Sequence, residues 1–394
     1  MASEPRRIPL SDWADRKLRL LAEETGSARL AQVAGSTLVG ERGSNNDYVY
    51  RGKISAGPGG SRLLPTRDGG WFCLTVLRDE DRAMLPALFM DEALDFHSQE
   101  AIAEAALQHD CMELVERGRL LGLPVASADE VPPSPPVEVL ATGPHRERET
   151  GHRPFVVDLS AIWAGPLAGH LLWLAGAEVV KVESLARADL IRRDDPATFD
   201  LINQGKANIV LDLTKDAERE NLIALIRRAD FVIESSRVRA LRHLGVDADA
   251  LVRETPGLVW LTVTGHGATG DPSNWAGIGH DCGVAGGLAR ALADAAGEVG
   301  YVGDAMADPL TGIFAALEGW RAYMNGEARR MGFAMSSVVA MVLKEERERD
   351  PAGVERDLRL WAAAIGELFP KVPRRELQAP VHSIGADNAQ YLPC

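Results

Sequence analysis

The chain has 394 residues and a net charge of −14, with 46% hydrophobic and 25% charged residues. This composition is ordinary for a water-soluble folded protein, and the acidic balance argues against general nucleic-acid binding. Its four cysteines lack C-x-x-C spacing, which favours a reducing cytoplasm, and no apolar run predicts a signal peptide or a membrane span. We therefore expect a cytoplasmic protein without a membrane partner.

The N-terminal part of the chain predicts a small module between two irregular segments. Residues 1–59 are polar and partly helical, and their glycine-rich loop at 51–60 is interpreted as a connector, because no phosphate-loop pattern surrounds it. Residues 60–130 predict a small α/β domain, since two short apolar runs flank a turn and amphipathic helical patterns follow. Residues 131–152 open with VPPSPP and continue into a charged run, which predicts a linker.

Residues 153–343 alternate strand and helix patterns. The strand Phe155–Asp158 precedes a loop, an apolar helical pattern at 167–174 and a second apolar strand at 177–182. This is a βαβ unit, and its strands lack polar alternation as expected where helices cover both faces. Three more apolar runs read as strands: 208–213, 231–234 and 259–264. The predicted fold is α/β, with a doubly wound, mostly parallel, Rossmann-like sheet in a large domain and a second, smaller α/β domain.

The end of the chain and the position of a ligand complete this outline. Residues 344–394 are charged and then proline-bearing, and we predict an extended C-terminal arm. Ligands in open α/β sheets bind outside the carboxyl ends of the strands. The loop after Asp158 is therefore an expected part of the binding site.

The stretch VVDLSAIWAGPLAGHLLWLAGAEVVKVE resembles the opening of the family III CoA-transferases, which include formyl-CoA and carnitine-CoA transferases and alpha-methylacyl-CoA racemase. Further motifs follow in the family's order: Asn203-Gln204-Gly205-Lys206, Phe231 to Arg237 (FVIESSR), and Thr262 to Gly270 (TVTGHGATG). Residues 60–130 resemble the family's small domain, which normally follows the large one. The resemblance implies an acyl-CoA-handling enzyme with acyl-CoA and a carboxylic acid as substrates, and a homodimer that can be interlocked.

The resemblance implies that the chemical centre lies in GIGHDCGVAGG, residues 277–287. Asp281 aligns with the catalytic aspartate of the transferases. A carboxylate there attacks an acyl-CoA thioester, and the resulting anhydride reacts with CoA to give an aspartyl-CoA thioester. The alternative interpretation is that Asp281 only caps the following helix. The expected function is an acyl-CoA:carboxylate CoA-transferase.

Two other functions are compatible with the sequence. Residues 279–281 read G-H-D as in the racemase branch, so His280 and Asp304 are a candidate acid/base pair for a 2-methylacyl-CoA racemase or epimerase. Asp308, before Pro309, matches the transferase motif A-D-x-x-x-G but is interpreted mainly as a helix N-cap. The third possibility is a CoA-binding homologue without turnover.

Coenzyme A is the expected cofactor-like substrate, and no metal is expected. The resemblance implies that the CoA nucleotide lies near the loop after the first strand and the N-Q-G-K segment. Lys206 is expected to meet phosphate, although Gln204 replaces the arginine usual in that motif. The expected CoA-binding residues are Ala164, Gly165, Pro166, Lys181, Glu183, Asn203, Lys206, Arg237, Gly265 and Gly267.

Overall fold

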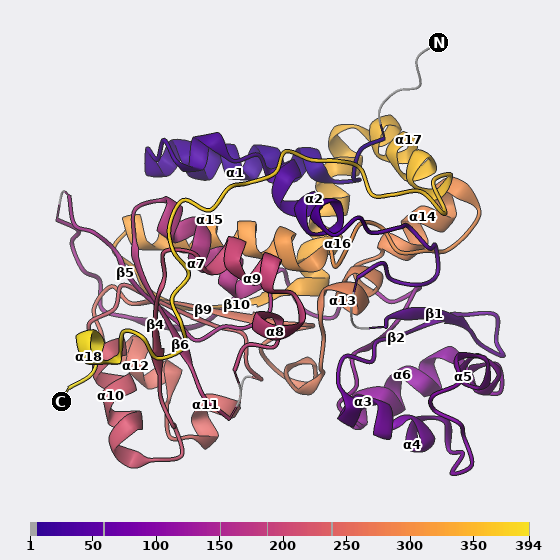
Figure 1. The fold of residues 1–394 in the computed structure, drawn as a ribbon, viewed down its shortest axis with the longest axis horizontal. Helices are drawn as coiled ribbons and strands as arrows, with labels where there is room; N and C mark the ends of the chain where they lie inside the picture. Colours follow the sequence, from indigo (N-terminus) through magenta and orange to yellow (C-terminus); the bar gives the residue numbers. More distant parts are fainter. Residues whose placement is uncertain (1–5, 58–59, 150, 187, 238, 394) are drawn as a thin grey trace.

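The centre of the structure is a seven-stranded sheet in the order β4-β10-β9-β8-β5-β6-β7 (Figure 1). The computed structural model describes residues 6–57, 60–149, 151–186, 188–237 and 239–393. Neighbouring strands are parallel except at the edge, where β4 runs antiparallel to β10. The strands are β4 (Val137–Gly143), β5 (Phe155–Asp158), β6 (Glu178–Glu183), β7 (Ala207–Val210), β8 (Phe231–Glu234), β9 (Val259–Thr264) and β10 (Ala328–Ala334). The predicted α/β class with a doubly wound, mostly parallel sheet is confirmed.

The chain leaves β5 in two directions, which creates a switch point inside the sheet. β6 and β7 follow on one side of β5, whereas β8, β9 and β10 are added on the other. The loops after β5 and β8 therefore diverge at the carboxyl ends of two neighbouring parallel strands. Open α/β sheets bind ligands at this position.

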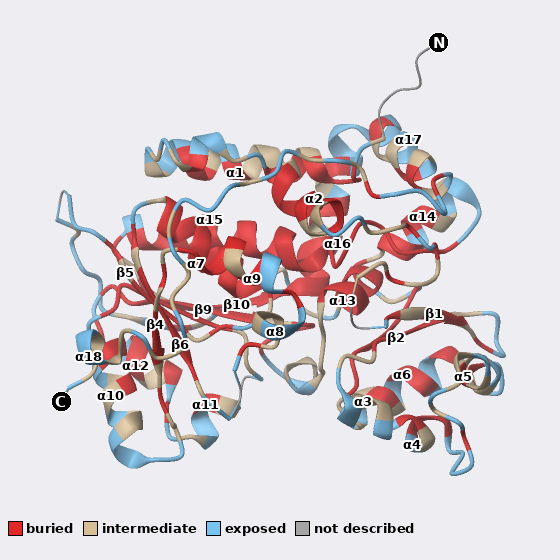
Figure 2. Ribbon diagram, in the orientation of Figure 1, coloured by how far each residue is buried: buried red, intermediate tan, exposed pale blue. Residues whose placement is uncertain are grey.

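Helices cover both faces of the sheet, as the apolar strands require. Along β5, Val156 packs into the core on one face and Val157 into the core on the other. The first core is built with α7 (Ala164–Leu174), α15 (Ala307–Met324) and α16 (Met335–Arg349), and the second with α10 (Asp216–Ile226) and α12 (Ala248–Glu254). Every residue of α7 is buried, and Figure 2 shows α7 and α15 among the most buried parts of the chain.

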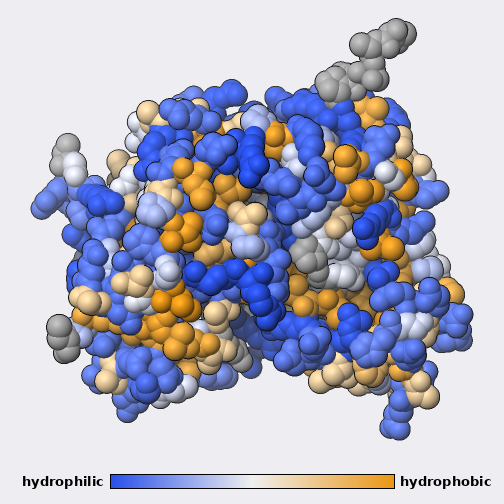
Figure 3. Space-filling view, viewed as in Figure 1, coloured by the Kyte–Doolittle hydropathy of each residue, from blue (hydrophilic) through white to orange (hydrophobic). Residues whose placement is uncertain are grey.

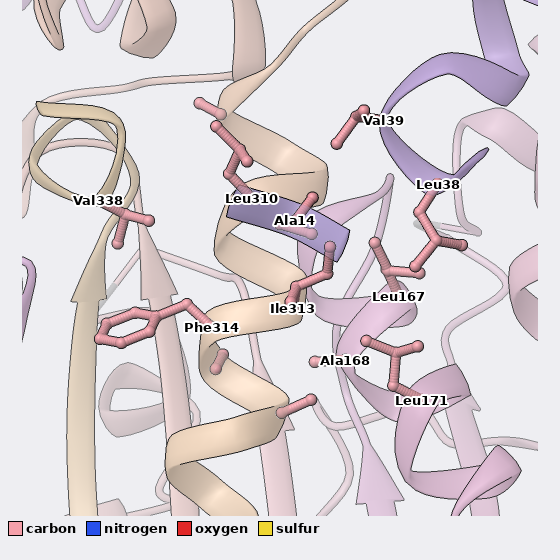
Figure 4. Close-up of a cluster of buried hydrophobic side chains, with 14 of the residues drawn as sticks. Ala14, Leu38, Val39, Leu167, Ala168, Leu171, Leu310, Ile313, Phe314 and Val338 are labelled. Carbon is pink, nitrogen blue, oxygen red and sulfur yellow. The ribbon is translucent and has the colours of Figure 1, made fainter. Parts of the chain in front are cut away.

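The N-terminal helices belong to the same core as α7 and α15. These helices are α1 (Ser11–Thr25) and α2 (Gly35–Asn45), joined by the short 3-10 helix η1 (Leu30–Gln32). In Figure 4, Ala14, Leu38 and Val39 lie in one apolar cluster with Leu167 of α7 and Ile313 of α15. Residues 6–45 are therefore a structural part of the large domain.

A three-stranded antiparallel sheet, with its own apolar core, forms a smaller unit beside the large sheet (Figure 1). Its elements are β1 (Arg62–Pro65), β2 (Trp71–Leu74), α3 (Asp79–Ala83), α4 (Leu85–Phe89), α5 (Gln99–Ala106), α6 (Cys111–Leu120) and β3 (Val125–Ser127). The outer face of this sheet, including Leu63 and Cys73, packs against Val284 and Ala285 of the large unit.

The linker predicted at 131–152 contains a strand and requires correction. Within it, β4 pairs with β10 from Val137 to Gly143 as an antiparallel edge strand. Most of its residues are only partly buried, because one side of an edge strand faces solvent. A strand of this kind needs little apolar sequence and gave little signal beside the prolines at 132–136. The other domain limits stay predictions.

The C-terminal part is helical before it becomes extended. The end of α16 and all of α17 (Pro351–Ala362) occupy the first part of the predicted arm, and residues 363–387 then run along α2 and α7 to β7 (Figure 1). The remaining helices are α8 (Ile191–Asp194), α9 (Pro196–Asn203), α11 (Ala240–His243), η2 (Asp271–Asn274), α13 (Gly279–Ala285), α14 (Leu288–Ala296) and α18 (Asn388–Tyr391). Within the described ranges, no helix combines the length and apolar character needed to cross a membrane.

Candidate functional site

A cleft of about 510 Å³ lies at the switch point, between the large sheet and the small unit. The loops after β5, β8 and β9 form one wall, and residues of the small unit form the other. Figure 3 shows the surface notched between these two parts. The lining residues include Ala161, Ile162, Ala164, Ser235, Arg237, Thr264, Gly265, Gly277, Ile278 and Asp308 from the large unit, and Leu77, Arg78, Asp81, Gly122 and Pro124 from the small one.

Asp308 brings a buried carboxyl group to this cleft. It lies in the first turn of α15, and its Oδ1 accepts a hydrogen bond from the Ala164 backbone N–H at 3.3 Å. Among the described residues, Oδ2 has no hydrogen-bond donor. The expected N-cap role is wrong, because Met306 precedes the helix and the Asp308 side chain bonds a different helix.

The pKa of Asp308 is shifted upward to near neutral pH. Burial raises the pKa of Asp308 to about 7, and the electrostatic effects of Arg42 and His280, with the hydrogen bond from the Ala164 N–H, oppose that rise only in part. The N-terminal end of α15 favours the ionised form, but this did not prevent the rise in pKa. A carboxyl group with such a pKa in a cleft is a typical catalytic candidate.

Asp281 is fully buried and does not line the cleft. Its Oδ1 accepts a hydrogen bond from the Ile278 backbone N–H at 2.9 Å, so the carboxylate caps its own helix, α13. Its Oδ2 faces His266 Nε2 at 3.6 Å and Cys282 Sγ at 3.8 Å. This geometry corresponds to the alternative interpretation of the sequence, in which Asp281 is a capping residue.

His280 and Asp304 lie in a buried charged cluster that extends to the N-terminal segment. His280 Nε2 is 3.3 Å from Asp304 Oδ1, and Arg42 Nη1 is 3.1 Å from Asp304 Oδ2. Arg42 also binds Asp195 through Nε at 3.0 Å and lies over the ring of Trp163. Burial raises the pKa of Asp304, but Arg42 and His280 outweigh it and the pKa falls below its usual value. Arg42 comes from α2, where no motif indicated a site residue.

The two lysines expected at the CoA site are instead interior residues, which corrects their predicted position. Lys206 Nζ binds Asp158 Oδ2 and the Pro166 carbonyl, both at 2.8 Å, and Asn203 Oδ1 at 3.0 Å. Burial lowers the pKa of Lys206 to about 8, and Asp158 opposes the fall. Both lysines are essentially inaccessible to a phosphate group.

Lys181, on strand β6, is also a buried cation that binds a carboxylate and a backbone carbonyl. Its Nζ binds the Ser160 carbonyl at 2.9 Å and Asp189 Oδ2 at 3.0 Å, so Lys181 holds the loop after β5, whereas Lys206 holds the first turn of α7. Glu183 is also buried and accepts hydrogen bonds from Arg192 and, at 2.6 Å, from Asn208 Nδ2. These buried charged residues therefore hold the segments after β5 in place from the interior.

The other predicted residues divide between the cleft and its surroundings. Ala164, Gly265 and Arg237 line the cleft, whereas Gly165 and Pro166 are buried in the first turn of α7. Gly267 has φ +153° and packs against Ser134, away from the lining. The C-terminal arm covers the N-Q-G-K segment, where Gln204 Oε1 accepts the Gln378 N–H at 2.6 Å.

Unpaired arginines are the main electrostatic feature at the cleft. Arg78 and Arg237 line it, and Arg239 lines an adjoining pocket of about 250 Å³ that shares Ser273 with the cleft. None of the three forms an ion pair with an acidic side chain in the described part of the chain; Arg237 contacts only the Gly122 carbonyl, at 3.4 Å. Because the protein is strongly acidic overall, this grouping of free cations indicates an anionic ligand.

Comparison with known proteins agrees with the resemblance seen in the sequence. Residues 154–344 match the model of CoA-transferase family III. The chain is 30% identical to the succinate–glutarate CoA-transferase of Agrobacterium fabrum, over 48% of this chain and 52% of that protein. It is 33% identical to the succinyl-CoA:mesaconate CoA-transferase of Haloarcula hispanica, over 28% and 31% of the two chains.

The matched region is only part of each relative. The chain spans about half the length of the first of these proteins and less of the second. The crystal structure of a CAIB/BAIF family protein from Brucella suis matches 50% of this chain and 56% of that one, with 29% identity and a TM-score of 0.45. Residues 154–344 of this chain are therefore similar to CoA-transferase family III.

Proposed function

We propose that this protein is an acyl-CoA:carboxylate CoA-transferase and that Asp308, rather than Asp281, is its nucleophile. The observation that carries the proposal is the position of Asp308: a carboxyl group at the cleft, with one oxygen held by Ala164 and a pKa of about 7. At neutral pH about half of such groups are ionised. Asp281 has no comparable access, because its side chain is fully buried.

The proposed reaction proceeds through two anhydrides and one thioester on Asp308. The ionised carboxylate attacks the acyl-CoA carbonyl, the C–S bond breaks, and CoA leaves as a thiolate. The thiolate then attacks the aspartyl carbonyl of the mixed anhydride, which releases the donor acid as its carboxylate and leaves an aspartyl-CoA thioester. The acceptor carboxylate attacks this thioester, and the released CoA thiolate takes the acceptor acyl group and regenerates Asp308.

The surroundings of Asp308 support this sequence of steps. An anhydride is lost to hydrolysis unless water is kept away, and Asp308 is only 7% exposed. CoA carries phosphate groups, for which the guanidinium groups of Arg78, Arg237 and Arg239 are suitable partners. The match of residues 154–344 to the family model and the relatives' names favour the same class of reaction.

The geometry gives less support to racemisation. A racemase of this type needs an acid and a base on opposite faces of the substrate α-carbon. His280 and Asp304 contact each other at 3.3 Å, and neither lines the cleft. No substrate carbon fits between two groups at that separation.

The test is mass spectrometry of the protein after incubation with succinyl-CoA, with glutarate or mesaconate as the acceptor. These compounds are taken from the names of the two relatives. We expect a hydroxylamine-sensitive CoA adduct on the peptide that contains Asp308, no adduct in Asp308→Asn, and a retained adduct in Asp81→Asn, which alters the other carboxyl group of the cleft.

Other outcomes would redirect the assignment. An adduct on Asp281 would restore that residue as the nucleophile. Deuterium at the acyl α-carbon in heavy water, without an adduct, would favour the racemase. Bound CoA with neither signal, across a wider panel of acyl-CoA donors, would favour a binding homologue without turnover.

A further inference from the structure

We propose that His266, Asp281 and Cys282 form a zinc-binding site beneath the floor of the cleft. His266 follows β9, and the other two residues belong to α13. The proposal is independent of the transferase assignment, because it concerns side chains that do not line the cleft. It departs from the sequence-based expectation that the chain holds no metal.

The three side chains offer donor atoms at coordination spacing. His266 Nε2 lies 3.6 Å from Asp281 Oδ2, and Cys282 Sγ lies 3.8 Å from the same oxygen. All three donor atoms fall within 4.8 Å of one another. Tetrahedral zinc with bonds of about 2.0–2.3 Å separates its ligand atoms by roughly 3.3–3.8 Å. The observed spacing therefore requires only small side-chain shifts to accommodate an ion.

The unsatisfied state of His266 is an independent reason to expect a ligand. Its side chain is fully buried, and neither ring nitrogen has a hydrogen-bond partner in the described structure. Its Nε2 is directed toward Asp281 Oδ2, but 3.6 Å is too long for a hydrogen bond. Buried polar groups without partners are uncommon in folded proteins. A cation between Nε2 and Oδ2 would bind both atoms at once.

The charges of the three ligands suit a divalent ion of intermediate softness. Asp281 Oδ1 is held by the Ile278 N–H, which leaves Oδ2 for the metal. On binding, the Cys282 thiol loses one proton to solvent, and the thiolate and carboxylate balance the two positive charges. Sulfur, imidazole and carboxylate together favour zinc over magnesium or calcium, which select oxygen ligands.

The position of the site indicates a structural effect on the cleft. Gly277 lines the cleft on one side and lies directly over the cluster on the other. A β-carbon at Gly277 would stand 2.7 Å from Cys282 Sγ and 3.1 Å from His266 Nε2, so only glycine fits there. The metal would tie the end of β9 to the start of α13. The wall formed by Gly277 and Ile278 would thereby be fixed.

The test measures zinc in the full-length protein, purified without chelators, before and after dialysis against zinc and then metal-free buffer. We expect one zinc per chain and an X-ray absorption spectrum with one sulfur neighbour at about 2.3 Å and nitrogen or oxygen neighbours at about 2.0–2.1 Å. Replacement by cobalt should give the absorption bands of tetrahedral coordination and of a cobalt–thiolate bond. These spectra use the wild-type protein and do not depend on a variant that folds.

Variants then assign the ligands. Cys282→Ser and His266→Gln should each weaken zinc binding at least tenfold, and Cys282→Ser should remove the cobalt–thiolate band. Cys73→Ser and Cys111→Ser alter the two other free thiols of residues 6–393 and should change neither result. Zinc that remains below about a tenth of an equivalent, zinc without a sulfur neighbour, or a thiolate band that survives Cys282→Ser would overturn the proposal.

Discussion

Arg42 is the contribution of the N-terminal helices to the buried cluster, and its replacement should make Asp308 harder to ionise. The Arg42 side chain is 10% exposed and binds Asp304 and Asp195 at 3.1 and 3.0 Å. Its positive charge opposes the rise that burial imposes on the pKa of Asp308. Arg42→Met removes that charge with little loss of side-chain volume.

The size of the effect follows from Coulomb's law. At an effective dielectric constant of about 20, two unit charges interact by about 4 kcal/mol at 4 Å and by about 2 kcal/mol at twice that distance. We use the lower value, because the ion pairs of Arg42 in the described structure are with Asp195 and Asp304 and not with Asp308. That energy corresponds to about 1.5 pKa units. The pKa of Asp308 would rise from about 7 to about 8.5, and the ionised fraction at pH 7 would fall about 15-fold. This is an upper estimate, because Asp304 also becomes easier to protonate.

The assay is the pH dependence of kcat/KM for acyl transfer, which reports groups of the free enzyme. The proposed nucleophile is active when ionised, so the rate rises with pH through the pKa of Asp308. The variant's rising limb should move to higher pH, and its rate should approach the wild-type value above pH 9. Infrared difference spectra of the protonated carboxyl, assigned with Asp308→Asn, measure the same shift without turnover.

Arg16→Met is the matched control for this experiment. Arg16 joins the N-terminal helix α1 to Glu346 of α16, outside the cluster around Asp304. Its replacement weakens the docking of the N-terminal helices but removes no charge near Asp308. A shift below about 0.3 units in Arg42→Met, a shift to lower pH, or an equal shift in Arg16→Met would refute the reasoning.

Three further predictions concern stability and binding. The pKa of Asp308 is raised from 3.8 to about 7, so burial of its carboxyl group costs no stability below pH 3.8, where the group is protonated, and the free energy of unfolding falls as the pH rises through 7. Asp308→Asn should therefore stabilise the protein at pH 8 by at most about 4 kcal/mol, and urea titrations should show that this gain vanishes at pH 4. Arg237→Gln should weaken CoA binding about tenfold at low salt in calorimetry, whereas Arg227→Gln, an arginine already paired with an acid, should not; equal affinities would remove Arg237 from the site. Lys206→Met should cost about 3–5 kcal/mol of unfolding free energy, because it leaves Asp158 buried and unpaired; a loss of CoA affinity in a protein of unchanged stability would instead support the phosphate role.

The large sheet was predictable because its strands carry a strong local signal. The apolar runs ending at Asp158 and Glu234 lie side by side in the structure, and the switch point follows from their order. β4 was missed because an edge strand needs only one partner and tolerates half-exposed residues. The cytoplasmic location and the homodimer stay predictions.

Burial explains where the site prediction failed. Asp281 and Asp308 both precede apolar helical patterns, and sequence alone does not reveal which carboxyl group faces the cleft. Lys206 belongs to a recognisable motif, but its ion pair with Asp158 joins residues 48 positions apart. The match of Asp308 to A-D-x-x-x-G was an available signal for the cleft residue. Arg42 had none, because its partners become neighbours only when the N-terminal helices pack on α15.

During protein synthesis, the N-terminal helices are made before the residues that they contact in the folded structure. Arg42 leaves the ribosome well before Asp195 and Asp304, which at about 5–20 residues per second means a delay of up to tens of seconds. During that time the apolar faces of α1 and α2, including Trp13 and Leu38, lack the helix that later covers them. The nascent chain therefore has to hold these helices unpaired, a state that favours chaperone binding. For the same reason, residues 154–344 expressed alone would expose the other half of that interface and should aggregate.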